Sequence, residues 1–140
     1  MPNIYHQFVV EKPVSVVFDG ISQPELLDQW WTKRSSGQPK MDAQYKLFFG
    51  PEYDWVAKVT ICDPLHRFEL QMTKADKDWM GTQVGFELQS EGELTVAHFY
   101  HQGWPHENDH FKISRYCWAM YLRILKRYLE TGEVVPYENR

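Results

Sequence analysis

The middle of the chain, residues 44–102, alternates hydrophobic and polar side chains in short runs separated by turn-forming residues. In the run RFELQMT, Phe68, Leu70 and Met72 share one side and the polar side chains share the other. A period of two is typical of β-strands that bury one face. The joins CDPLH and SEGE are turn-like and short, so consecutive strands should run antiparallel. This stretch therefore predicts an antiparallel meander whose apolar face needs a cover.

Six strands are expected in total. One precedes the meander, and the six cover residues 4–12, 44–50, 53–63, 66–73, 81–90 and 93–102. In the first strand, alternate residues from Ile4 to Val10 share one face. The polar stretch TKRSSGQPKMD before the meander is rich in turn formers and is expected to be a loop.

Two short helices are expected between the first strand and this loop. Pro13 opens the first helix, a position where its missing N–H costs little. Ser22 and Glu25 have the spacing of a capping box at the start of the second helix. That helix should end at the adjacent Trp30 and Trp31, on the same side as its leucines. Two neighbouring indoles are more than so short a helix needs for its own packing. They suggest either part of a pocket wall or side chains that fill one end of the core.

The C-terminal part has helical periodicity from about Phe111 to Thr131. Asn108 or Asp109 can cap its start, and Gly132 is a typical stop. Its apolar stripe consists of Ser114, Cys117, Trp118, Tyr121, Leu122, Leu125 and Leu129. Packing this helix across the apolar sheet face gives an α+β fold. Because sheets twist, a curved sheet and a straight helix leave a gap, which large side chains fill or which stays open as a pocket.

The order of these elements resembles the helix-grip fold of the START-like (SRPBCC) superfamily. More narrowly, the sequence is similar to the domain of activator of 90-kDa heat-shock protein ATPase homologues (AHSA type). The similarity rests on PVSVVFDGISQPELLDQWW, AQYKLFFG, GTQVGFEL, LTVAHFYHQGW and CWAMYLRILKRYLETGE. It implies one domain over residues 1–140, with a curved antiparallel sheet of about six strands wrapped around the C-terminal helix.

Members of this superfamily are implied to bind hydrophobic ligands, to cyclise polyketides or to act in stress responses. Three functions stay open for this chain. The first is binding of a hydrophobic small molecule, lipid-like or aromatic, in an apolar pocket between sheet and helix. The second is a cyclase or dehydratase-type enzyme that uses pocket His and Tyr side chains. The third is a co-chaperone-like accessory role. An enzyme needs at least two polar groups that converge on a reacting atom.

Aromatic residues make up 16% of the chain, enough to line such a pocket. The strand and helix periods, with the register of the last strand taken from the resemblance, predict the lining residues. They are His6, Phe8, Trp30, Trp31, Tyr45, Leu47, Phe49, Trp55, Phe68, Leu70, Met72, Phe86, Phe99, His101, Trp118, Tyr121 and Leu122. For each of them plain core packing is the alternative. His6, Tyr45, His101 and Tyr121 are the polar candidates for orienting a ligand.

The segment HFYHQGWPHENDH contains four histidines but does not have the spacing of a metal site. His98 and His101 lie three apart on a strand and point to opposite faces. No H-E-x-x-H or C-x-x-C motif accompanies them, so no zinc or iron is expected. His106 and His110 are expected in a surface loop. No G-x-S-x-G motif and no glycine-rich phosphate loop is present, and no catalytic residue or cofactor is predicted.

The net charge of −4 and pI of about 5.8 do not favour nucleic-acid binding, which needs a basic surface. No apolar run approaches the roughly 20 residues of a membrane-spanning helix, and no charged-then-apolar leader opens the chain. A cytoplasmic location is expected. Cys62 and Cys117 are expected to be buried reduced thiols. The sequence leaves open whether the chain forms a homodimer.

Overall fold

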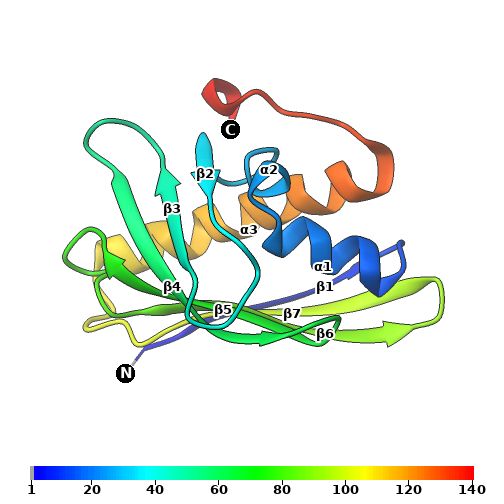
Figure 1. Ribbon diagram of the computed structural model, residues 1–140. Helices are drawn as coiled ribbons and strands as arrows, with labels where there is room; N and C mark the ends of the chain where they lie inside the picture. Colours follow the sequence, from blue (N-terminus) through cyan, green and yellow to red (C-terminus); the bar gives the residue numbers. More distant parts are fainter. Residues whose placement is uncertain (1) are drawn as a thin grey trace.

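The computed structural model describes residues 2–140 and has an α+β architecture (Figure 1). In chain order its elements are β1 (Ile4–Val10), α1 (Val14–Ser22), α2 (Pro24–Leu27), β2 (Arg34–Ser36), β3 (Gln44–Phe48), β4 (Asp54–Asp63), β5 (Arg67–Lys74), β6 (Gln83–Glu91), β7 (Leu94–Gln102), α3 (Asp109–Thr131) and a 3-10 turn (Tyr137–Asn139). The strands form one sheet in the order β1-β7-β6-β5-β4-β3-β2. Every neighbouring pair is antiparallel.

The long helix α3 runs across one face of the curved sheet, with α1 and α2 on the same side (Figure 1). This confirms the packing of helix on sheet predicted from the two periodicities and the helix-grip fold implied by the resemblance. The Asn108 side chain caps α3 by accepting a hydrogen bond from the backbone N–H of Phe111 at 3.0 Å. At the other end Gly132 adopts the left-handed conformation, φ 79°, that ends a helix. Trp118, Leu122 and Leu125 of α3 are buried against the sheet, as predicted.

The sheet has seven strands where six were expected, because β2 lies in the segment predicted to be a polar loop. Its three residues pair with Lys46–Phe48 of β3. The Ser35 hydroxyl, between them, hydrogen-bonds the carboxylate of Asp28 at 2.8 Å and lies 2.9 Å from the carbonyl oxygen of Pro24. So short and polar a strand has no hydrophobic alternation. Pairing to β3 and anchoring to α2 define it instead.

The predicted capping box of α2 is wrong. The Ser22 hydroxyl donates to the carbonyl oxygen of Phe18 at 2.6 Å, inside α1, and is not available to α2. Gln23 occupies the N-cap position and makes no side-chain cap bond. The regular helix ends at Leu27, and a turn carries the chain on to the tryptophan pair. Pro24 in the first turn and packing against neighbours therefore define this short element without a side-chain cap.

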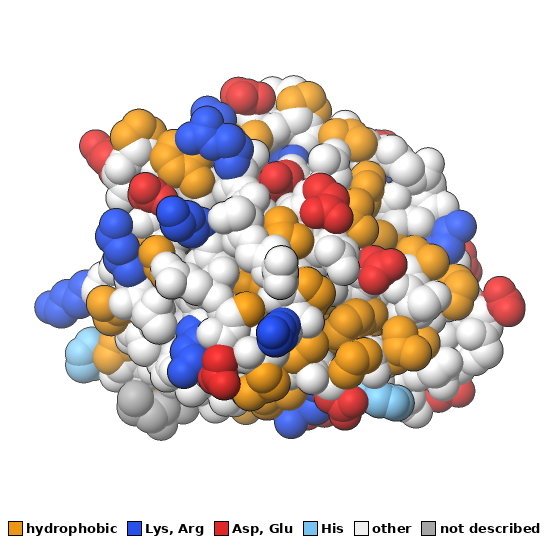
Figure 2. All heavy atoms as spheres, viewed as in Figure 1, with side chains coloured by type: hydrophobic (Ala, Val, Ile, Leu, Met, Phe, Trp, Pro, Cys, Tyr) orange, Lys and Arg blue, Asp and Glu red, His pale blue; other side chains and the backbone are white. Residues whose placement is uncertain are grey.

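None of the helices within residues 2–140 combines the length and hydrophobicity that a membrane span requires. Figure 2 shows the face seen in Figure 1, where Lys and Arg side chains are scattered among acidic and hydrophobic ones. The chain continues past α3 as a tail that turns back toward α2 and the β3–β4 hairpin (Figure 1). Two side chains fix this tail. The Tyr137 hydroxyl donates to the carbonyl oxygen of Phe49 at 2.9 Å, and Arg140 donates to that of Asp28 at 2.8 Å.

Candidate functional site

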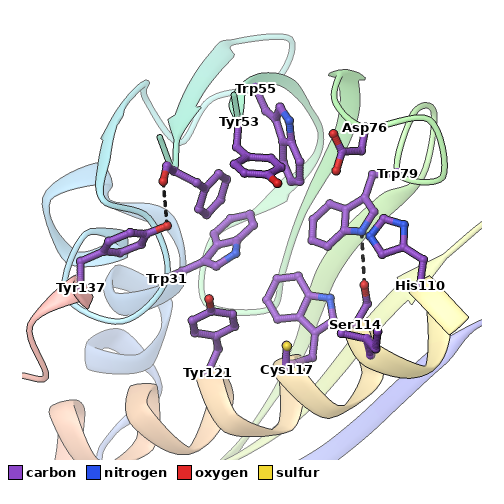
Figure 3. Close-up of a pocket in the computed structure, with 13 residues that line it drawn as sticks. Trp31, Tyr53, Trp55, Asp76, Trp79, His110, Ser114, Cys117, Tyr121 and Tyr137 are labelled. Atoms are coloured by element: carbon purple, nitrogen blue, oxygen red, sulfur yellow. Dashed lines mark hydrogen bonds between the residues drawn. The ribbon is translucent and has the colours of Figure 1, made fainter. Parts of the chain in front are cut away.

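A cavity of about 380 Å³ lies between α3, the β3–β4 hairpin and the β5–β6 loop (Figure 3). Its walls consist of Trp31, Phe49, Tyr53, Trp55, Asp76, Trp79, His110, Ile113, Ser114, Cys117, Trp118, Tyr121 and Tyr137. The exposed side chains of Tyr53 and Ile113 contribute to its rim. The C-terminal tail contributes Tyr137, so segments far apart in the sequence build this one space.

The inner wall of the cavity is a closed circuit of aromatic rings, which we call the aromatic circuit. The centroid distances are 5.6 Å for Trp31–Phe49, 5.2 Å for Phe49–Trp55, 4.9 Å for Trp55–Trp79, 5.8 Å for Trp79–Trp118 and 5.3 Å for Trp118–Trp31. Aromatic pairs at such separations attract each other by about 0.5–1.5 kcal/mol beyond the area that they bury. Each ring is held by two neighbours, so the circuit gives the cavity a preformed wall.

The adjacent tryptophans in the turn after α2 have different surroundings. The Trp30 indole N–H donates to the carbonyl oxygen of Gly20 at 2.9 Å, and its ring packs edge-on against Phe86. Trp31 stacks on Trp30 at 5.9 Å and presents its ring to the cavity. The backbone N–H of Trp31 donates to the carbonyl oxygen of Leu27 and continues the helical turn, which fixes the positions of both indoles. Trp30 therefore belongs to the hydrophobic core, whereas Trp31 forms part of the cavity wall.

The structure brings together only part of the predicted pocket. Trp31, Phe49, Trp55, Trp118 and Tyr121 line the main cavity. A second cavity of about 170 Å³ between β1 and α3 is lined in part by His6, Phe8 and Leu122. The remaining predicted residues are buried in the core: Trp30, Tyr45, Leu47, Phe68, Leu70, Met72, Phe86, Phe99 and His101.

Several cavity residues were missed by sequence reasoning. Asp76 and Trp79 lie in the connection KADKDWMG, and Tyr137 lies beyond the last predicted helix. A large apolar ring inside a polar connection was the available signal for Trp79. His110 was expected in a surface loop, but it belongs to the first turn of α3 and lines the cavity. Ser114 and Cys117 did belong to the predicted apolar stripe of this helix.

His101 is a fixed structural group beneath the aromatic circuit. The Trp118 indole N–H donates to its Nδ1 at 3.0 Å, so its own proton is on Nε2, which lies 2.8 Å from the hydroxyl oxygen of Thr82. Thr82 in turn donates to the carbonyl oxygen of Trp79. Burial disfavours the imidazolium form and, with a smaller contribution from His110, lowers the pKa of His101 to about 3. Both ring nitrogens are occupied, so this histidine positions two indoles and does not exchange protons with a ligand.

Of the other three polar candidates, two interact with backbone carbonyl oxygens and one lines the main cavity. His6 Nε2 lies 3.3 Å from the carbonyl oxygen of Arg115, away from the main cavity. The Tyr45 hydroxyl donates to the carbonyl oxygen of Ser22 at 2.6 Å. Tyr121 does line the cavity, and burial raises the pKa of its phenol, which keeps it a neutral hydrogen-bonding group.

His110, which lines the cavity, is paired with Asp78. His110 Nδ1 lies 3.1 Å from a carboxylate oxygen of Asp78, and the Asn108 side chain donates to the same oxygen at 3.3 Å. These hydrogen bonds, that of His110 first, lower the pKa of Asp78. Two turns further along the cavity side of α3, burial raises the pKa of the Cys117 thiol and keeps it protonated. No group of three His, Cys, Asp or Glu side chains within residues 2–140 is arranged to hold a metal ion.

The family of the chain follows from its sequence profile. The profile described as "Activator of Hsp90 ATPase homolog 1-like protein" matches residues 11–130. The chain belongs to this family. The START-like resemblance read from the sequence is thereby confirmed. The match ends before the tail, so Tyr137 of the cavity wall lies outside the matched region.

Solved structures share the fold. The solution structure of the Aha1 dimer from Colwellia psychrerythraea has 27% sequence identity and a TM-score of 0.85, and the match covers 95% of this chain and 99% of that one. Protein SSP2350 from Staphylococcus saprophyticus has 18% identity and a TM-score of 0.78 over 96% of each chain. DynU16, from the dynemicin biosynthetic locus, has 22% identity and a TM-score of 0.77 over 96% of this chain and 50% of that one. No curated protein is significantly similar in sequence.

Proposed function

We propose that this AHSA1-type chain binds a small hydrophobic molecule in the cavity beside α3. The observation that carries the proposal is the aromatic circuit, a preformed apolar wall around an open space of about 380 Å³. Ligand sites are commonly clefts of roughly 300–1,000 Å³ lined by apolar and aromatic side chains with a few polar groups. Here Ser114, Tyr121 and His110 are such groups. A flat apolar ring system would gain contact with several rings at once.

Filling the cavity from its α3 wall should weaken this binding. Cys117→Trp places an indole where the small thiol now lines the cavity, and we expect the affinity for 2-naphthol, a neutral aromatic probe, to fall at least about tenfold (about 1.4 kcal/mol). Tyr116→Trp is the matched control, because Tyr116 is 75% exposed on the same helix. Isothermal titration calorimetry measures both variants, and circular dichroism checks that both are folded.

Two outcomes would count against the binding proposal. One is a Cys117→Trp variant that binds 2-naphthol as tightly as the unaltered protein. The other is an unaltered protein that binds none of a panel of fatty acids, flavonoids and naphthols at micromolar concentration.

A second candidate function, acid–base catalysis of the cyclase or dehydratase type, is favoured by the His110–Asp78 pair. A carboxylate that holds Nδ1 of a histidine leaves Nε2 available for proton transfer. Cyclisation of a polyketide begins with removal of a proton next to a carbonyl, so 2-tetralone, an apolar ketone, is a suitable probe. We expect the protein in D₂O to accelerate exchange of the α-protons of 2-tetralone, followed by NMR, and His110→Gln to abolish the acceleration. His106→Gln, at an exposed site, is the control. Exchange at the buffer rate with the unaltered protein would eliminate this function.

A further inference from the structure

We propose that the ligand of this cavity carries an organic cation, a quaternary or tertiary ammonium group joined to an apolar body. The inference rests on the proposed function of the cavity as a binding site and narrows its ligand class. The ammonium group would lie against the indole faces of Trp55 and Trp79, next to the carboxylate of Asp76. The apolar body would extend toward Trp31 and Trp118.

Aromatic faces are the first reason. A cation is attracted to the negative face of an aromatic ring, most strongly to that of tryptophan, and quaternary ammonium groups are recognised by cages of such rings. The indoles of Trp55 and Trp79 lie 4.9 Å apart at 46° to each other, so their rings form two inclined walls. Tyr53 packs edge-on against Trp55 at 6.0 Å and adds a third ring at the rim.

Charge is the second reason. No lysine or arginine of residues 2–140 is among the residues that line the cavity, whereas Asp76 is. In this part of the chain the carboxylate of Asp76 has no hydrogen bond or ion pair, in contrast to Asp78, which is held by His110 and Asn108. The carbonyl oxygen of Asp76 accepts hydrogen bonds from the N–H groups of Trp79 and Met80, which fixes the turn that carries the side chain. A negative charge without a partner is thus held at the cavity edge.

At the opposite end of the cavity, positively charged side chains of the protein already lie over the ring of Tyr137. Arg140 lies over the ring of Tyr137 at 5.5 Å from its centroid, and Lys33 at 6.0 Å. A ligand cation at that end would be repelled. Figure 3 shows Tyr137 and Asp76 on opposite sides of the cavity, so the charge distribution gives the ligand one orientation.

Apart from the carboxylate of Asp76, few acceptors lie beside the faces of Trp55 and Trp79, which favours an alkylated ammonium over a primary amine. A primary ammonium has three N–H donors to satisfy, and burying unmatched donors is costly. The Ser114 hydroxyl already accepts from the Trp79 indole at 3.4 Å (Figure 3). Trimethylammonium has no N–H to satisfy and presents a diffuse positive surface that suits aromatic walls.

Two isosteric probes test the inference. Phenyltrimethylammonium and tert-butylbenzene have nearly the same shape and differ in charge. Calorimetric titration should give at least tenfold tighter binding of the cation. Asp76→Asn should remove most of that difference and leave the affinity for tert-butylbenzene unchanged. Asp63→Asn, an exposed aspartate at the end of β4, is the matched control and should change neither affinity.

The outcomes separate this inference from the function on which it rests. Equal binding of both probes, or an equal loss of both in Asp76→Asn, overturns the cation inference and leaves hydrophobic binding intact. If neither these probes nor the neutral aromatics bind, both fail. Dihexanoylphosphatidylcholine distinguishes a lipid headgroup from a small soluble cation. We expect it not to displace phenyltrimethylammonium, because two acyl chains exceed a cavity of about 380 Å³. Displacement would assign the ammonium group to a lipid.

Discussion

Leu125→Asp is expected to destabilise the protein severely. Leu125 is fully buried, 0% exposed, where α3 packs on the sheet. An aspartate there loses the apolar contacts of leucine and puts an unpaired carboxylate out of water. The two effects together should lower the free energy of unfolding by about 4–5 kcal/mol or more. Since small domains are stable by about 5–15 kcal/mol in all, this loss is a large share of the total.

Urea denaturation followed by circular dichroism measures this loss. Ala119→Asp on the exposed side of the same helix is the control, and it should cost less than about 1 kcal/mol, mainly through helix propensity. A Leu125→Asp variant with the urea midpoint of the unaltered protein would show that this side of α3 does not face the sheet.

Acidification should destabilise the protein through His101. The folded protein keeps this histidine neutral, with its pKa lowered to about 3, whereas the unfolded chain takes up a proton near the ordinary value of 6.5. Between these two values the unfolded state binds more protons. The stability therefore falls with decreasing pH by about 1.4 kcal/mol for each pH unit, or about 3 kcal/mol from pH 7 to pH 4.

The variant His101→Gln isolates this contribution, because glutamine does not titrate. It should be less stable than the unaltered protein at pH 7, where it loses the bonds to Trp118 and Thr82. Its stability should then fall less steeply as the pH is lowered. His106→Gln, which alters an exposed histidine, should keep the full pH dependence. Parallel curves of urea-derived stability against pH for His101→Gln and the unaltered protein would refute the assignment.

Most of the fold could be predicted because it depends on side-chain period. Alternation assigns Leu70 and Met72 to the buried face, and the helical stripe assigns Leu122 and Leu125 to the sheet, as the structure shows. The strand β2 has no such signal, since its pairing depends on β3 and on bonds to α2.

The cavity was less predictable, for a physical reason. A period of two tells which face a side chain occupies, but not how far along the strand the helix still touches the sheet. Leu47 and Met72 lie on the predicted face and are fully packed, whereas Trp55 on the same face lines the cavity. The residues that complete the site, such as Trp79 and Tyr137, come from a connection and a tail, where no periodicity exists.

The aromatic circuit also affects the tryptophan fluorescence of the protein. Trp30 stacks on Trp31, and Trp104 lies 6.2 Å from Trp79, so both remaining tryptophans adjoin the circuit. All six indoles of the chain thus form one connected set. At such separations excitation energy passes between rings faster than it is emitted. We therefore expect the six tryptophans to share excitation energy, so that a molecule that quenches one cavity indole lowers the emission of the whole set.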